Sequence, residues 1–188
     1  TKPERTFDKS AVAVWTFIAS ESAFFLILII AYVFFNFHVT TGPSAATVLD
    51  VGKTGGFTAC LFASSLTLWL SERCLEKKQH DAATRWLIVT ISLGLIFMGG
   101  QGTEYVGLFE RGVGVSTNLF TTTFFTLTGF HGLHVTMGLF ALTIALVLMI
   151  AGDFRRRRSS LLRAIGLYWH FVDVVWLVVF SVVYLRIR

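Results

Sequence analysis

The chain has 188 residues, of which 54% are hydrophobic and only 14% are charged, and its mean hydropathy is +0.70. This composition excludes a soluble domain with a polar exterior, and it makes the lipid bilayer the expected solvent. The net charge of +5 is interpreted as a signal of membrane topology. A nucleic-acid partner is not expected, because basic connections beside apolar segments are explained by orientation and by anionic lipid.

Five apolar segments approach the roughly 20 residues that one membrane crossing needs. They predict an all-α bundle of five transmembrane helices over residues 11–37, 55–71, 85–109, 119–151 and 162–185. The apolar runs are continuous rather than alternating, which argues against strands in a membrane. Because no tandem repeat or soluble domain is found, residues 1–188 are expected to form one multi-pass membrane domain.

The distribution of basic residues predicts the orientation. Twelve of the 16 Lys and Arg residues precede the first predicted helix or lie in the second and fourth connections, including the arginine run at 155–158. Basic residues collect on the cytoplasmic side of membrane proteins. The N-terminus is therefore predicted in the cytoplasm and the C-terminus outside.

The first predicted helix carries a carboxyl group, Glu21, about 15 Å from its cytoplasmic end. An ionisable side chain at this depth costs roughly 2.5–3.5 kcal/mol on insertion scales, so it needs a local partner. Two interpretations stay open. Glu21 relays protons or holds a polar lipid headgroup, or it forms a hydrogen bond with a neighbouring helix.

The third predicted helix places two polar side chains on one face, because Gln101 and Glu104 are three residues apart. Glu104 lies near the expected outer interface. A structural anchor is favoured over a chemical role for this pair.

Two further pairs lie in the last two predicted helices. His131 and His134 share one face, and His170 and Asp173 share another. Histidines with a carboxylate resemble metal ligands, but this spacing fits packing equally well and no Glu-x-x-His motif accompanies it. Hydrogen bonds between helices are expected, with Asp173 and Glu21 at comparable depth and able to meet. No metal or cofactor site is predicted in this chain.

Several segments together resemble subunit III of the haem-copper terminal oxidases, the cytochrome c and quinol oxidases. The matching segments are TGFHGLHV at 128–135, YWHFVDVVW at 168–176, FIASE at 17–21, Ser64, Ser65 and Thr67, and the Gln-x-x-Glu-Tyr motif of Gln101, Glu104 and Tyr105. Their order and separations agree over almost all of the chain. Seven-helix members carry two further N-terminal helices and hold lipids in a V-shaped cleft, whereas this chain resembles the short five-helix bacterial form.

The resemblance implies an accessory subunit with no catalytic centre or cofactor of its own, bound to the catalytic subunit I that holds the haems and copper. It implies a bacterial inner membrane, contacts with other oxidase subunits, and support of proton uptake, lipid organisation and turnover stability. His80 and Asp81 are expected near the proton entrance. Bound phospholipid and a respiratory supercomplex are further candidate partners. The alternatives are a subunit III-like protein linked to nitric oxide reductases, a secondary transporter and a membrane cytochrome.

Overall fold

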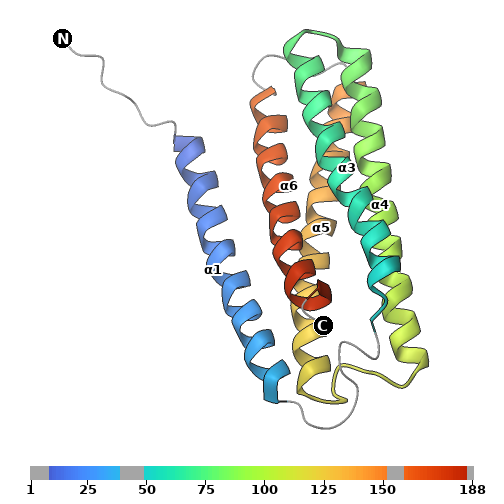
Figure 1. Cartoon of the computed structure of the whole chain (residues 1–188). Helices are drawn as coiled ribbons and strands as arrows, with labels where there is room; N and C mark the ends of the chain where they lie inside the picture. The colour runs from blue at the N-terminus through green and yellow to red at the C-terminus, as the bar shows by residue number, and fades with distance from the viewer. Residues whose placement is uncertain (1–8, 39–48, 152–158, 186–188) are drawn as a thin grey trace, which may run out of the picture.

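The computed structural model describes residues 9–38, 49–151 and 159–185, and it confirms the predicted all-α class with five long helices. The helices are α1 (Lys9–His38), α3 (Val51–Glu76), α4 (His80–Glu110), α5 (Leu119–Ile150) and α6 (Ser159–Phe180), the last continuing into a π-helical turn, η1 (Ser181–Leu185). Successive helices run in alternate directions, so α1, α4 and α6 begin at the same end of the bundle (Figure 1). The arginine run at 155–158 lies outside the described residues.

Side-chain caps mark the starts of α3 and α5. The helix α3 begins four residues before the predicted segment, because the Asp50 carboxylate accepts a hydrogen bond from the Lys53 N–H at 3.0 Å and caps the first turn. The helix α5 begins at Leu119 as predicted, where Asn118 and Thr121 form a reciprocal capping box. Hydropathy marks only the hydrocarbon-facing part of a helix, whereas caps fix its ends.

Four helices contain segments that are long and apolar enough to cross a membrane. These segments are Val14–Asn36, His80–Glu110, Leu119–Ile150 and Leu161–Leu185. The helix α3 is not among them, because its hydroxyl and charged side chains lower its hydropathy. Its crossing and the orientation of the bundle stay predictions.

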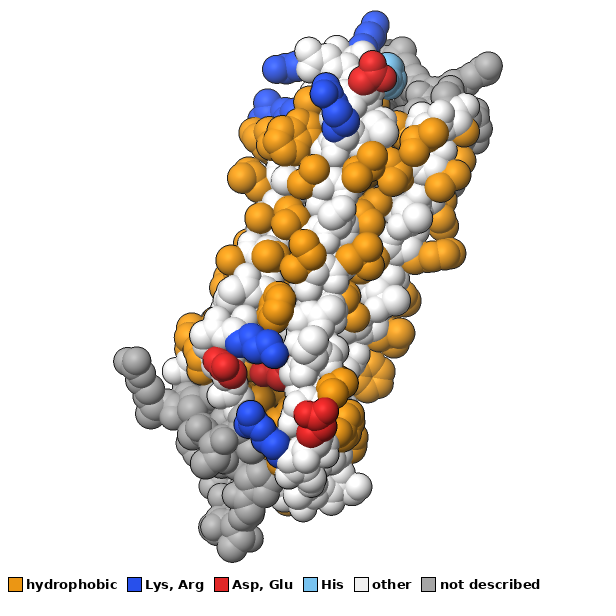
Figure 2. Space-filling view, turned by 90° about the vertical axis from the view of Figure 1, so that its right-hand side faces the viewer, with side chains coloured by type: hydrophobic (Ala, Val, Ile, Leu, Met, Phe, Trp, Pro, Cys, Tyr) orange, Lys and Arg blue, Asp and Glu red, His pale blue; other side chains and the backbone are white. Residues whose placement is uncertain are grey.

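The surface of the bundle is divided into an apolar belt and two polar ends. Figure 2 shows hydrophobic side chains covering the middle of one face, with charged side chains gathered toward the two ends. Exposed large hydrophobic residues of the belt include Leu95, Phe140 and Val174. This pattern is the one expected of a protein whose middle contacts lipid or other membrane helices.

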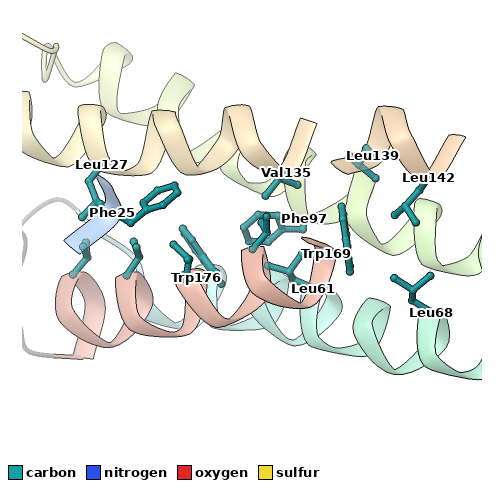
Figure 3. Packing of buried hydrophobic residues seen from close by; sticks show 14 of the residues in the cluster. Phe25, Leu61, Leu68, Phe97, Leu127, Val135, Leu139, Leu142, Trp169 and Trp176 are labelled. Atoms are coloured by element: carbon teal, nitrogen blue, oxygen red, sulfur yellow. The ribbon is translucent and has the colours of Figure 1, made fainter. Parts of the chain in front are cut away.

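Buried side chains from all five helices meet along the bundle axis, and α6 contributes the largest of them (Figure 3). The Trp169 ring is completely buried, and its Nε1–H donates to the Ser64 hydroxyl of α3 at 3.0 Å. Its edges lie against Gly94 of α4 and Gly138 of α5, where an added Cβ would come within 3.1 and 2.7 Å of the ring. The small residues allow one tryptophan to contact three neighbouring helices.

The helix α1 is the most peripheral element. Only 11% of its most apolar stretch is buried, against 39% of the most apolar stretches of α5 and α6. It packs on α5 and, less extensively, on α6. Its other sides expose Trp15, Ile27 and Ile30. Contacts made by α1 with its neighbours therefore depend on few residues.

Candidate functional site

Glu21 of α1 contacts His134 of α5 through Oε2 and Nε2, which are 3.0 Å apart. The other ring nitrogen of His134, Nδ1, lies 2.7 Å from the Phe130 carbonyl oxygen, and the Phe25 ring packs against the imidazole. A carbonyl only accepts, so Nδ1 must donate. One proton then lies between Glu21 Oε2 and His134 Nε2. Whether the oxygen or the nitrogen carries it, the two side chains together have no net charge. This geometry matches the hydrogen-bonding interpretation of Glu21.

A second polar contact joins α3 and α6. The Ser65 hydroxyl lies 2.9 Å from His170 Nδ1 and donates to Asp173 Oδ2. The second carboxyl oxygen of Asp173, Oδ1, is buried and has no hydrogen-bond partner among the described residues. Asp173 and Glu21 were considered able to meet at comparable depth, and the structure gives them separate partners on separate helices. The serine was missed as a site residue, although its polarity within an apolar helix could have marked it.

A third carboxyl group, Glu104 of α4, is held near the opposite end of the bundle. Its Oε1 accepts a hydrogen bond from the Thr54 hydroxyl at 3.1 Å, and its Oε2 accepts one from the Tyr184 hydroxyl at 2.7 Å. Tyr184 belongs to the π-helical turn, so this contact ties the end of α6 to α3 and α4. Gln101 is buried one turn before Glu104. The anchor role of the pair stays a prediction.

His131 departs from the expectation of a hydrogen bond between helices. Its ring is buried, and neither nitrogen has a hydrogen-bond partner within the described ranges. The ring instead stacks on Trp176, with centroids 4.7 Å apart and planes inclined by 27°. Phe25 and Phe97 lie edge-on to it. His131 and His134 share a face, but an aromatic environment surrounds the first and a carboxyl group reaches only the second.

Among the described residues there is no group of three or more His, Cys, Asp or Glu side chains that could hold a metal ion. The two cysteines, Cys60 and Cys74, are free. Glu21, Asp173 and Glu104 lie in three separate contacts between helices.

The family model described as cytochrome c oxidase subunit III matches residues 8–187, almost the whole chain. The chain belongs to this family. The sequence resemblance to subunit III of the haem-copper oxidases is thereby confirmed, and with it the assignment to a membrane family of the respiratory chain.

Individual members of the subunit III family are similar over nearly the full length. The chain is 37% identical to cytochrome c oxidase subunit 3 of Synechocystis sp., with 95% of this chain and 76% of the relative aligned. It is 32% identical to cytochrome bo(3) ubiquinol oxidase subunit 3 of Pseudomonas aeruginosa, with 91% and 82% aligned. It is 30% identical to cytochrome c oxidase subunit 3 of Thermostichus vulcanus, with 96% and 89% aligned. These names include two different electron donors, so membership of the subunit III family does not distinguish between them.

Proposed function

We propose that this chain is a non-redox accessory subunit III of a haem-copper terminal oxidase in a bacterial inner membrane, bound to the catalytic subunit that carries the haems and copper. Family membership supports the assembly, and the three carboxyl contacts support the accessory role. Glu21, Glu104 and Asp173 each form a hydrogen bond with a side chain from another helix of the same bundle. Such groups fix the positions of helices relative to one another.

In this proposal all five helices cross the membrane, and the N-terminus lies in the cytoplasm. The helix α3 has 26 residues, which span about 39 Å at the rise of an α-helix, more than the hydrocarbon thickness. It packs antiparallel between α4 and α6, both of which contain candidate membrane spans. Lys77 and Lys78 lie in the turn from α3 to α4, and Arg85 lies in the second turn of α4, which favours the cytoplasmic side for that end.

The role proposed for the bundle is to support proton uptake by its partner. His80 and Asp81 form the exposed first turn of α4, at the end assigned to the cytoplasm. Exposed groups of this kind exchange protons with water near a proton entrance. The exposed apolar sides of α1 offer a surface on which phospholipid is kept in order beside the catalytic subunit. Together these effects would sustain turnover without any redox step in this chain.

The test compares the purified oxidase with and without this subunit in matched lipid. Electron entry and the haem spectra are expected to stay nearly unchanged, while proton uptake slows at alkaline pH and the enzyme inactivates sooner during turnover. Oxygen consumption followed over many turnovers measures both effects. Identical lifetimes and identical pH profiles would reject the supporting role and leave assembly as the function.

A further inference from the structure

The carboxyl group of Glu72, near the end of α3, rests directly against the backbone of α6 at Gly166. A Cβ added to this glycine would overlap Glu72 Oε1 and come within 3.1 Å of Cδ. Gly166 is buried, and the Glu72 side chain is half-buried. The carboxyl group therefore fills the space that the side chain of any other residue at position 166 would need. This space is called the Gly166 notch.

The Gly166 notch offers no hydrogen-bond donor to an ionised carboxyl group. Gly166 is the eighth residue of α6, beyond the first four residues whose N–H groups lack a partner within the helix. No residue in the described part of the chain donates a hydrogen bond to the Glu72 carboxyl group. A carboxylate only accepts hydrogen bonds, whereas the protonated acid also donates. The notch therefore suits the neutral acid, and burial accordingly raises the pKa of Glu72 to about 7.

One cation lies where the ionised carboxyl group can reach it. Arg163 precedes Gly166 by three residues, so the two share a face of α6. Its Nη2–H group donates to Glu76 Oε1 at 3.0 Å, and the side chains of this pair are 75% and 57% exposed. An ion pair as exposed as this one contributes little to stability, so Arg163 can exchange one acidic partner for another. Glu72 and Glu76 are four residues apart on α3 and compete for it.

The other titratable groups near this end face elsewhere. Arg73 is held over the Trp69 ring, 4.7 Å from its centroid. The side of α3 that meets α4 is marked by Ser71, which donates to an α4 carbonyl group at 2.8 Å and lies about 100° around the helix from Glu72. His170, one turn after the notch on α6, contacts a serine two turns before Glu72. The charges that shift the Glu72 pKa are therefore those of Arg163 on α6 and of Glu76 on α3.

We propose that Glu72 and the Gly166 notch form a pH-sensitive latch between α3 and α6. At acidic pH the neutral carboxyl group fills the notch and holds the start of α6 against α3, while Arg163 pairs with Glu76. At alkaline pH the carboxylate leaves the notch and takes Arg163 as its partner, and this contact between the two helix ends is lost. The latch is built from this chain alone, so it goes beyond the accessory role proposed in an oxidase.

Two substitutions fix the latch in opposite states. Glu72→Gln retains a neutral side chain of the same size, which stays in the notch at every pH. Gly166→Ala fills the notch with a methyl group, and the carboxyl group can move aside because it ends a flexible side chain. Glu110→Gln is the matched control, because this exposed residue ends α4 at the opposite end of the bundle.

Spin labels on the exposed residues Lys77 and Leu161 measure the separation of the two helix ends in the full chain in lipid nanodiscs. The unaltered chain and the Glu110 variant should change their distance distribution between about pH 5 and about pH 8, on either side of the Glu72 pKa. Glu72→Gln should keep the acid distribution at both pH values, and Gly166→Ala the alkaline one. No pH response in the unaltered chain, or an undiminished response in Glu72→Gln, would overturn the latch.

The exchange of partners by Arg163 has its own test in the same measurement. Arg163→Gln removes the cation that stabilises the carboxylate, so the pH at which half of the chains have changed should rise. Glu76→Gln removes the competitor for that cation, so the midpoint should fall. A merely structural role of the contact would leave both midpoints where they are in the unaltered chain, and that result would refute the exchange.

Discussion

The packing of Trp169 between two glycines predicts that Gly138→Ala destabilises the bundle. An added Cβ at Gly138 would lie 2.7 and 2.9 Å from two carbon atoms of the Trp169 ring, distances that side chains in proteins do not adopt. The indole is rigid, and its far edge already lies against Gly94. The ring therefore cannot move away from α5 without approaching α4, and the helices must separate instead.

The expected magnitude follows from two opposing terms. Overpacking of a filled core costs about 1–3 kcal/mol. Alanine in place of glycine within a helix returns roughly 0.5–1 kcal/mol through lower backbone entropy in the unfolded chain. The net loss in the free energy of unfolding should therefore be about 0–2.5 kcal/mol. Displacement of the ring would also strain its hydrogen bond to Ser64.

Gly99→Ala is the matched control, because Gly99 lies within α4 and nothing comes within 4 Å of its added Cβ. This variant should be as stable as the native chain or slightly more stable. Reversible unfolding in mixed detergent micelles, followed by tryptophan fluorescence, measures both free energies. Equal stability of the two variants would show that Trp169 is not confined between α4 and α5, and the packing argument would be refuted.

Three further predictions concern topology, charge and pH. Single cysteines placed in the α3–α4 turn should react only with reagents on the cytoplasmic side, and those in the α4–α5 connection only from outside; the reverse pattern would contradict the orientation. Glu21→Gln should keep substantial oxidase turnover, because an amide can still hydrogen-bond His134; complete loss of activity in a fully assembled complex would show an obligatory proton on Glu21. Glu72 follows the predicted membrane segment of α3, and burial raises its pKa from 4.5 to about 7, while the neighbouring Arg163 opposes the shift. The folded state holds a proton that the unfolded state releases between these values, so stability relative to Glu72→Gln should fall as pH rises from 4.5 to about 7; unfolding at about pH 5 and about pH 8 measures this difference, with the exposed Glu110→Gln as control.

The sequence was sufficient to predict the helices, because continuous apolar runs leave few alternatives in a membrane. It also identified the polar residues that needed partners, Glu21, Glu104 and Asp173 among them. Residues three apart on one helix share a face wherever that helix lies. Predictions that depend on a single helix could therefore be made from the sequence.

Partners from different helices could not be predicted in the same way. Glu21 meets His134 rather than Asp173, because the rotation of each helix about its axis is set by packing of the whole bundle. His131 has no hydrogen-bond partner among the described residues because the Trp176 ring lies beside it, which spacing along α5 cannot reveal. The π-helical turn that directs Tyr184 toward Glu104 has no simple sequence pattern.

The peripheral position of α1 has a consequence for the order in which the protein is made. The helices α3 and α4 can pair as soon as both are synthesised, since Thr67 and Thr90, which hydrogen-bond across that pair, are 23 residues apart. Glu21 must wait for a histidine 113 residues later in the chain. At ribosomal speeds of 5–20 residues per second the delay is on the order of ten seconds. Throughout that interval the Glu21 carboxyl group is without its histidine, so early entry of α1 into lipid carries the cost of an unpaired ionisable side chain until α5 is made.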